Sequence, residues 1–542
     1  MLELTLAQKI GQLFLVQMNG PVLSEDYKKH FAATKIGNYI LFAKDLTDYQ
    51  SIRQLTDSLQ DMAKDICGVP AFISTDQEGG MVTRVFSGAT HFPSNMAITA
   101  SGMRDAMHCV GEMVGIELRN LGINVNHAPV LDINNNPQNP VIGIRSYSDD
   151  PAVVAEMGVK YINGLQKSGV IAGGKHFPGH GDTGIDSHLD LPFIAHDLER
   201  MHDVELVPFQ AAIQNGVDSL MTAHIKFTAI DNEMPATLSP QIITEFLREK
   251  LGFEGLVISD CMTMKAIKDK YTTEKGCVMA LNAGVDLLCL NADADIQAAC
   301  YHTVLEAVLS GELPIEKVDA AVTRILKYKY KYDIGSAAPQ PMASYPAHEA
   351  LADEISAKSI TLTHDQNKSV PWHTLSPAEK LETASSFSAY KKILPLTGKH
   401  FLTIAPPPVR TSIADDTVTT MEPFFKQAAA EFGNAFCEIS INPGADEITS
   451  VLASAAAYEL ILFGCYSAMV NPGQIHLFDA LKSAGKAVVV VSLRIPYDIL
   501  KMKDADCHIA AYEYTNRAVA NAIKVLAGKI EPVGVLPVRL DV

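Results

Sequence analysis

The sequence lacks the features that mark membrane-spanning and nucleic-acid-binding proteins. No segment of its 542 residues is long and apolar enough to span a bilayer. The formal net charge is −18, and the basic residues form no stripe along the chain. Nucleic acids and anionic membranes attract concentrated positive charge, so neither is an expected partner. We expect a globular protein of at least two domains, because this length exceeds what one hydrophobic core usually supports.

The sequence also lacks paired cysteines. Its nine cysteines are scattered singly, are odd in number and form no C-x-x-C pair, which suits reduced thiols better than a disulfide framework. Residues 1–20 have no basic region ahead of an apolar core, so they do not resemble a signal peptide. These observations favour a cytoplasmic protein. A secreted or lipoprotein form, with a leader that this chain does not contain, is the alternative.

Short β-rich apolar runs recur eight times before residue 291. Most of them are separated by helical patterns, such as 151–169 and 197–216, each of which ends in a glycine that can cap a helix. Strands that alternate with helices form parallel sheets. Eight such units predict an α/β fold of the (β/α)₈ TIM-barrel type rather than an open doubly wound sheet. The runs occupy residues 11–18, 36–43, 70–75, 123–133, 169–177, 218–225, 255–259 and 285–290.

A change of composition near residue 335 predicts a domain boundary. A final helical pattern over 314–334 runs into GSAAPQPMASYPAHE, whose proline, glycine and serine content is typical of a linker. Beyond it, the apolar runs KILPLT, FLTIAP, CEISI, YELILFGC and AVVVVSLR alternate with helical patterns such as 422–433. This alternation predicts a smaller α/β domain with a mainly parallel sheet. We place the barrel at 1–335, the linker at 336–349 and the second domain at 350–542.

Polar residues follow five of the predicted strands. The active site of a (β/α)₈ barrel lies at the carboxyl ends of its strands. One such residue is often only a helix N-cap, but five groups are hard to explain by capping alone. For Asp260 the two roles are compatible, because SDCMTMKAI could begin a helix whose dipole keeps the carboxylate ionised. The residues are Asp76, Gln77, Glu78 and Arg84 after the third strand, Asp132 and Arg145 after the fourth, Lys175 and His176 after the fifth, His224 after the sixth and Asp260 after the seventh.

The stretch GGKHFPGHGDTGIDSH, residues 173–188, concentrates titratable groups among five glycines. His176 and His180 have H-x₃-H spacing, but the intervening Pro-Gly breaks the helix that would align them, and Lys175 would repel a metal ion. The stretch also lacks the pattern of a phosphate-binding loop. The remaining interpretation is a mobile loop that carries a histidine and a carboxylate to the barrel mouth. Asp186 could then hold one ring nitrogen of His188 while the other faces a ligand.

The residues also carry a resemblance to a known family. KHFPGHGDTGIDSHLDLP (175–192) followed by VISDCMTMKAI (257–267) resembles the signature of glycoside hydrolase family 3, specifically its bacterial β-N-acetylglucosaminidases. STDQEGG, HAPVLDINNNPQNPVIGIRSY and MTAHI…MPATLSP are similar to segments of the same group, in the same order. Together these segments span the predicted barrel. The C-terminal part, which ends in GVLPVRL, resembles the α/β sandwich domain of the two-domain members.

The resemblance implies a retaining, exo-acting hydrolase that removes terminal β-linked N-acetylglucosamine, typically from peptidoglycan fragments during cell-wall recycling. It implies that Asp260 is the nucleophile and His188 the general acid/base, with Asp186 as its partner. The family usually has an arginine where this chain has Met81, which puts the hydroxyl contacts of that corner in doubt. The resemblance assigns sugar binding to Asp76, Arg84, Arg145, Lys175 and His176.

This assignment agrees with the chemistry of retention, which needs a carboxylate to attack the anomeric carbon and a second group to protonate the leaving oxygen. With a histidine as the acid, the site depends on an imidazole that titrates near neutrality. If His188 only binds substrate, Glu78 is the next candidate for the acid. We expect a carbohydrate substrate, no cofactor and no required metal ion.

Two other functions stay open at this point. A phosphorylase could use the same scaffold, because a histidine acid leaves the site less negative than a glutamate and so tolerates phosphate. A sugar-binding protein could have kept the barrel and lost the chemistry, although the presence of both Asp260 and His188 argues against it. The sequence does not indicate the natural aglycone, the oligomeric state or the role of the second domain.

Overall fold

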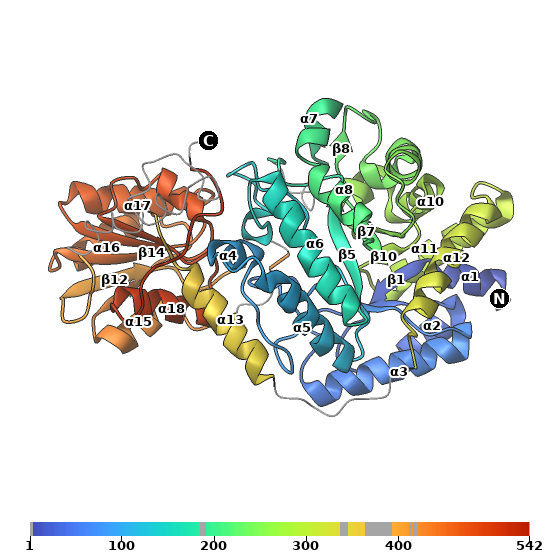
Figure 1. Ribbon diagram of the computed structural model, residues 1–542, viewed down its shortest axis with the longest axis horizontal. Coiled ribbons are helices and arrows are strands. Elements are labelled where there is room, and N and C mark those ends of the chain that lie inside the picture. The colour runs from blue at the N-terminus through green and yellow to red at the C-terminus, as the bar shows by residue number, and fades with distance from the viewer. Residues whose placement is uncertain are drawn as a thin grey trace.

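The computed structural model describes residues 4–184, 191–336, 345–363, 393–410, 414–415 and 421–540. It contains two main sheets, one in each half of an elongated molecule (Figure 1). The first sheet lies between residues 14 and 290 and the second between residues 361 and 510. Within the described ranges, no helix combines the length and apolar character needed to cross a membrane.

The first sheet is an eight-stranded parallel barrel. Its strand order is β10-β1-β2-β3-β4-β5-β7-β9, and a parallel bridge between Ile258 and Leu287 joins the two end strands. Each predicted apolar run contains one strand, so the predicted barrel is confirmed. The strands are β1 (Phe14–Gln17), β2 (Tyr39–Ile40), β3 (Ile73–Thr75), β4 (Val125–Asn126), β5 (Ile171–Phe177), β7 (Ser219–Thr222), β9 (Leu256–Ser259) and β10 (Leu288–Leu290).

Helices surround the barrel and bury their apolar faces against it (Figure 1). The larger ones are α2 (Glu25–Thr34), α3 (Tyr49–Cys67), α5 (Ala106–Asn120), α6 (Pro151–Lys167), α8 (Val207–Gln214), η3 (Gln241–Lys250), α10 (Thr273–Ala283), α11 (Ala294–Ser310) and α12 (Ile315–Lys331). Shorter elements are α1 (Leu6–Gln12), α4 (Asn95–Ala100), η1 (Gly143–Arg145), α7 (Leu198–Asp203), η2 (Ala236–Leu238), α9 (Lys265–Tyr271) and the small sheet of β6 (Phe193–Ile194) with β8 (Lys226–Phe227).

The helical patterns are confirmed with one correction. Helix α6 begins where Asp150 accepts hydrogen bonds from the backbone of Ala152 and Val153, and it ends just before Gly169, whose φ is +88°. The pattern over 197–216 is not one helix but two, α7 and α8. Pro208 lies in the first turn of α8, where its missing N–H costs nothing; inside a continuous helix it would remove a hydrogen bond.

The second sheet has six strands in the order β11-β16-β15-β14-β12-β13, and only the β11–β16 pair is antiparallel. The strands are β11 (Thr361–Leu362), β12 (Phe401–Ala405), β13 (Phe436–Glu438), β14 (Leu460–Cys465), β15 (Ala487–Ser492) and β16 (Cys507–Ala510). Its helices are α15 (Phe424–Phe432), α16 (Ala445–Ala455), α17 (Pro472–Ser483), α18 (Asn516–Leu526) and the short η7 (Pro496–Leu500). A mainly parallel sheet was predicted here and is confirmed.

The prediction of a strand at KILPLT, in this half, is wrong. Its residues from 393 onward form turns rather than a strand. Pro395 has no N–H to give to a sheet, and the neighbouring Leu396 instead donates its backbone N–H to the carbonyl of Leu526, at the end of α18. The position next to β15 belongs to β16, which lies between β15 and the edge strand β11 and which the sequence analysis did not single out.

The two halves share an apolar contact. Met81, Met96 and Ile144 of the first half lie in one buried cluster with residues of the second, such as Tyr512 and Leu493. Helix α13 (Pro346–Ser359) packs against both α4 and α18 (Figure 1). It begins inside the segment predicted as a linker, of which residues 337–344 lie outside the described residues.

Helices α5 and α6 approach each other closely because glycines line their contact. A Cβ atom on Gly164 would lie 2.0 Å from the carbonyl oxygen of His108, and one on Gly111 would lie 2.4 Å from that of Tyr161. Both distances are far shorter than a carbon–oxygen contact allows. The spacing of these helices on the barrel therefore depends on the absence of side chains at these two positions.

We expect Gly164→Ala to lower the free energy of unfolding by about 1–3 kcal/mol, because the added methyl group must push α5 and α6 apart. Asn163→Ala is a matched control, since Asn163 is exposed on the same helix and alanine favours helix formation there. Chemical denaturation of both variants measures the effect. Equal stability of Gly164→Ala and the control would show that the two helices can separate without cost.

Candidate active site

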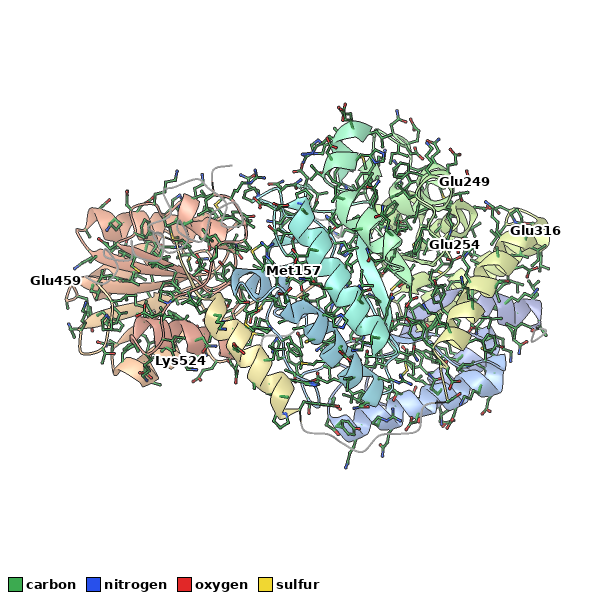
Figure 2. All side chains as sticks on the ribbon, in the orientation of Figure 1. Met157, Glu249, Glu254, Glu316, Glu459 and Lys524 are labelled. Carbon is green, nitrogen blue, oxygen red and sulfur yellow. The ribbon has the colours of Figure 1, made fainter. Side chains whose placement is uncertain are left out.

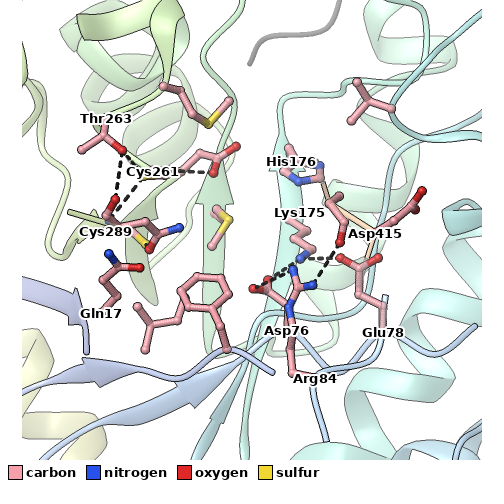
Figure 3. Close-up of a pocket in the computed structure, with 18 of the residues that line it drawn as sticks. Gln17, Asp76, Glu78, Arg84, Lys175, His176, Cys261, Thr263, Cys289 and Asp415 are labelled. Atoms are coloured by element: carbon pink, nitrogen blue, oxygen red, sulfur yellow. Dashed lines mark hydrogen bonds and ion pairs between the residues drawn. The ribbon is translucent and has the colours of Figure 1, made fainter. Parts of the chain in front are cut away.

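A pocket of about 520 Å³ lies at the carboxyl ends of the barrel strands. Residues at or after the carboxyl ends of β1, β2, β3, β5, β7, β9 and β10 line it, and residues of the second half complete one wall. Figure 3 shows Gln17, Cys261, Thr263 and Cys289 on one side, and Asp76, Glu78, Arg84, Lys175, His176 and Asp415 on the other. The polar and charged lining residues are Gln17, Lys44, Asp76, Glu78, Arg84, Arg145, Lys175, His176, His180, Asp260, Thr263, Lys265, Asn291, Arg410 and Asp415.

A buried network of alternating charges forms one side of this pocket. Lys175 Nζ lies 2.7 Å from Asp76 Oδ1 and 2.6 Å from Glu78 Oε1. Arg145 binds Glu78 with two parallel hydrogen bonds, each 2.8 Å long, from Nε and Nη2. The side chains of Lys175 and Glu78 are only 3% and 2% exposed, so these charges are removed from water and need each other. The network joins β3, β5 and the short helix η1.

The network keeps its carboxylates ionised. Burial would raise the pKa of Glu78, but the positive charges of Arg145 and Lys175 outweigh it and hold this pKa at about 2. Burial likewise opposes ionisation of Asp76, yet Lys175 and Arg84 keep its pKa well below the usual range. The candidacy of Glu78 as a proton donor is therefore not supported, because an ionised carboxylate has no proton to give at neutral pH.

Arg84 connects this network to the second half of the protein. Its Nη2 lies 3.8 Å from Asp76 Oδ2, and its Nη1 donates a 3.0 Å hydrogen bond to the carbonyl of Ala414. Its guanidinium carbon also lies 5.5 Å from the centre of the Phe42 ring. Met81 is 2% exposed and belongs to the apolar cluster between the two halves, so it does not line the pocket. Arg84 and Asp76 thus face the pocket, whereas Met81 packs behind them.

Asp132 holds the start of the glycine-rich loop in place through hydrogen bonds. It is fully buried and accepts hydrogen bonds from the backbone N–H groups of His176 and His180, while His176 Nδ1 lies 2.6 Å from its Oδ2. Asp132 does not line the pocket, but both histidines do. Gly181 fits only because it has no side chain, since a Cβ atom there would lie 1.6 Å from the carbonyl oxygen of Ile133. The part of the loop around His180 and Gly181 is thereby held tightly against the segment that follows β4.

The two loop histidines differ in their surroundings. Burial, together with the electrostatic effect of the adjacent His176, lowers the pKa of His180 to about 4, so His180 is neutral at physiological pH. Its Nδ1 lies 2.8 Å from the hydroxyl oxygen of Thr183. Asp186 and His188, the predicted acid/base pair, lie in 185–190, outside the described residues.

Asp260 lies at the carboxyl end of β9, half-buried, and lines the pocket. The suggestion that it caps a helix is wrong, because α9 begins at Lys265 and its N-cap is Met264. A turn intervenes instead. Met262 N–H donates to the carbonyl of Cys289, and His224 Nε2 lies 3.0 Å from the carbonyl of Cys261. His224, another predicted site residue, therefore supports this turn and does not line the pocket.

His127, which follows β4, was not singled out from the sequence. It is fully buried, and within the described residues neither ring nitrogen has a hydrogen-bond partner. Burial lowers its pKa to about 4, although the negative charges of Asp76 and Asp260 act in the opposite direction. A neutral imidazole therefore lies close to both carboxylates without neutralising either.

The Nδ1 atoms of the His176 and His180 rings contact Asp132 and Thr183. In the described part of the chain, one group could offer three ligand atoms within 4.8 Å of one another, namely Asp182, His196 and Glu205. A positive charge adjoins this group, because the guanidinium of Arg200 lies 3.2 Å from Glu205. This charge would oppose a bound cation. This group does not line the pocket.

(β/α)₈ barrel enzymes have their active sites at the carboxyl ends of the barrel strands. The pocket of paired charges lies at that position, so the fold and the site together define a (β/α)₈ barrel enzyme. The chain belongs to glycosyl hydrolase family 3, since residues 5–328 match the N-terminal domain of that family. It is accordingly a glycoside hydrolase.

Full-length relatives support this membership. The solved structure of a glycoside hydrolase family 3 β-N-acetylglucosaminidase from Paenibacillus sp. str. FPU-7 is 36% identical, covers 99% of both chains and has a TM-score of 0.88. The β-hexosaminidase A of Pseudoalteromonas piscicida is 30% identical over 96% of this chain and 91% of its own length. A solved β-glucoside phosphorylase, 21% identical with a TM-score of 0.78 over 99% of this chain and 95% of its own, shares the fold alone.

Sequence reasoning missed two groups of lining residues. Gln17, Lys44 and Asn291 lie at or after the carboxyl ends of β1, β2 and β10, so the rule that identified Asp76 could have found them. Asp415 and Ala414 come from the second half. Asp415 is fully buried and bound by the guanidinium of Arg494. No local pattern in the sequence distinguishes it from the other acidic residues around it.

We expect Glu78→Gln to lower the free energy of unfolding by about 3–5 kcal/mol at neutral pH, because it leaves buried cations without their partner. The carboxylate titrates near ~4.3 in the unfolded chain and at about 2 in the folded protein. Its stabilisation is therefore complete above the unfolded value and is lost as pH falls through the folded one. The difference in the free energy of unfolding between wild type and variant should therefore narrow as pH falls from the unfolded to the folded pKa. Urea titrations at several pH values would measure it.

Glu156→Gln is the matched control. Glu156 also contacts one lysine and one arginine, Lys160 at 2.7 Å and Arg104 at 3.4 Å, but its ion pairs are on the surface. Exposed pairs contribute only about 0–1 kcal/mol. If both variants lose the same stability, the Glu78 network is no stronger than a surface ion pair.

Proposed function

We propose that this glycoside hydrolase is a retaining, exo-acting β-N-acetylhexosaminidase that removes terminal β-linked N-acetylglucosamine from peptidoglycan fragments. The names of the two full-length relatives support the specificity for N-acetylhexosamine. The observation that carries the proposal is that Asp260 lines the same pocket as Asp76, Lys175 and Arg145. One carboxylate is thereby placed beside a set of donors and acceptors suited to sugar hydroxyls.

In the proposed first step, Asp260 attacks the anomeric carbon and forms a covalent glycosyl-enzyme, while His188 gives its proton to the departing oxygen. In the second step, His188 takes a proton from water, which displaces Asp260 and releases the sugar with its original configuration. Asp186 would orient and charge the imidazole of His188. The family resemblance of the KHFPGHGDTGIDSH segment supports these two roles.

The buried network would bind the terminal sugar. Asp76 and Glu78 supply ionised acceptors, and Arg84, Arg145 and Lys175 supply donors whose positions are set by ion pairs. Because the charges already bind one another, they need little reorganisation when a sugar enters. His176 would add a ring nitrogen, since Asp132 engages only its Nδ1.

We place the protein in the cytoplasm. All nine cysteines, each of them in the described ranges, are free thiols. Seven are buried, and burial raises the pKa of thiols such as Cys261 and Cys289. Reduced, unreactive thiols suit a reducing compartment.

Hydrolysis of an aryl β-N-acetylglucosaminide tests the proposed activity. We expect turnover by the wild type without added metal, and a loss of several orders of magnitude in Asp260→Ala, because the nucleophile is gone. Mass spectrometry after treatment with a fluorinated sugar inactivator should place the label on Asp260. Labelling of another residue would contradict the assignment.

The same assay with inorganic phosphate tests the second candidate, a phosphorylase on this scaffold, which the many cations in the pocket favour. Hydrolysis requires that phosphate leave the rate unchanged and that free sugar be the product. A phosphate-dependent rate, with sugar 1-phosphate as the product, would replace the hydrolase by a phosphorylase.

His188→Ala should show a leaving-group signature. Without its acid, the enzyme should lose about 10²- to 10⁴-fold on disaccharides but much less on activated aryl glycosides, whose leaving groups depart unaided. The glycosyl-enzyme should then accumulate on aryl substrates and produce a burst. Asp186→Asn should act in the same direction but less severely, since the ring remains. Equal losses on both substrates would make His188 a binding residue.

A further inference from the structure

A group of side chains of the types that bind metal ions lies outside the pocket, beside the glycine-rich loop. Asp182, His196 and Glu205 each offer one ligand atom, and the three atoms lie within 4.8 Å of one another. Asp182 belongs to the loop, His196 follows β6, and Glu205 lies between α7 and α8 (Figure 1). The tertiary structure therefore brings together three segments that are separate in the sequence.

The three residues differ in their exposure and contacts. His196 Nε2 lies 2.5 Å from Asp182 Oδ2, and these two side chains are partly exposed. The side chain of Glu205 is only 3% exposed. Its Oε1 accepts hydrogen bonds of 3.2 Å from Asn135 Nδ2 and Arg200 Nη2. A buried carboxylate thus lies beside a partly exposed pair of an imidazole and a second carboxylate.

Two buried oxygen atoms in this region have no hydrogen-bond partner among the described residues. They are Glu205 Oε2 and Asn135 Oδ1, each of them shielded from water. A buried acceptor without a partner costs free energy, so native proteins usually satisfy it with a donor, a water molecule or an ion. Glu205 also offers a ligand atom close to those of Asp182 and His196. A cation bound among the three residues would therefore meet a carboxylate that is already removed from water.

Acidity alone does not distinguish this group from the rest of the molecule. The net charge of the chain is −18, and exposed acids such as Glu249, Glu316 and Glu459 lie on the outer parts of both halves (Figure 2). Water and salt screen carboxylates of that kind, so they bind cations weakly. The group at Asp182 differs because it combines an imidazole with a buried carboxylate oxygen that has no partner in the described part of the chain.

We propose that Asp182, His196 and Glu205 form a binding site for a divalent transition-metal cation, for which Zn²⁺ is the best-fitting ion. Zinc binds imidazole nitrogen and carboxylate oxygen at about 2.0–2.2 Å. The ligand atoms, which lie within 4.8 Å of one another, would approach by about 1 Å to share one ion. The partial exposure of Asp182 and His196 leaves room for this movement. Mg²⁺ and Ca²⁺ prefer oxygen ligands alone, so the imidazole selects against them.

Arg200 opposes the cation but does not cancel its attraction to the site. Two carboxylates outnumber one guanidinium, which leaves a net negative charge when the imidazole is neutral. The guanidinium contacts Glu205 Oε1, so Oε2 remains for the ion. The Arg200 side chain is also 38% exposed, so water screens its charge. A bound ion would link the glycine-rich loop to the α7–α8 segment outside the pocket, so the proposed role is structural and does not depend on the proposed function.

The test is equilibrium dialysis of the full-length chain, freed of metal with a chelator, against Zn²⁺. We expect the wild type to bind zinc and His196→Gln to bind it about 100-fold more weakly or not at all. Even residues that only support metal ligands commonly contribute about 10- to 100-fold. Glutamine keeps a hydrogen-bond donor toward Asp182, so the local fold should survive the substitution. Added Mg²⁺ should not displace the zinc.

His108→Gln is the matched control. His108 also lies beside a carboxylate, Glu112 at 3.9 Å, with a similar exposure of 39%, but within the described residues no third ligand completes a group there. This variant should bind zinc as the wild type does. The site is overturned if the wild type takes up no zinc, if His196→Gln binds as the wild type does, or if Mg²⁺ displaces the zinc. Zinc binding that is lost in His188→Ala but kept in His196→Gln would assign the ion to the predicted acid/base pair and reject the proposal.

Arg200→Gln should give a result of opposite sign. The substitution removes a charge that repels the ion, so zinc should bind about tenfold more tightly. Zinc should also raise the thermal unfolding midpoint of the wild type and of Arg200→Gln but not that of His196→Gln, because only a native state that binds the ion is stabilised. Weaker binding in Arg200→Gln, or an equal rise in all three proteins, would contradict the proposed site. Neither measurement uses a sugar substrate, so a failure here leaves the proposed function unaffected.

Discussion

The pairing of Lys175 with Asp76 and Glu78 is the interaction on which the rest of the site depends. Lys175 comes from β5 and both carboxylates follow β3, so the ammonium group reaches across the position of β4 in the barrel. All three side chains are largely removed from water, and a buried charge without its partner is strongly destabilising. One set of charges thus links the carboxyl ends of β3 and β5, and Arg145 of η1 completes their neutralisation.

The second half of the protein supports this network from behind. Glu513 accepts a 2.6 Å hydrogen bond from the backbone N–H of Ser94, and a Cβ atom on Gly80 would lie 2.7 Å from the same carboxylate oxygen. The segment that carries Asp76 and Glu78 is therefore held between the barrel and the second sheet. Arg84 reaches the carbonyl of Ala414 on the same side. The pocket has its observed wall only because the two halves are packed together.

Much of the barrel could be predicted from the sequence, because a buried parallel strand is a short apolar run and each run here is followed by polar residues. Two of the failures in secondary structure have the same origin. Helical periodicity continued through Pro208 and apolar content continued through KILPLT, but in both places a proline made the local hydrogen bonding incompatible with one continuous element. The pattern of apolar residues does not show at which positions a helix or sheet needs a backbone N–H group.

Of the predicted site residues within the described ranges, Asp76, Arg84, Arg145, Lys175, His176 and Asp260 all line one pocket. The sequence by itself determined this much, since strand order in a barrel brings the residues after each strand to one face. It did not determine that Asp132 and His224 turn away to support the backbone, nor that Asp415 joins the lining. Only the tertiary structure decided these contacts. Which partner a charged side chain meets depends on its distance from other residues across the barrel and between the two halves, and this distance cannot be inferred from spacing along the chain.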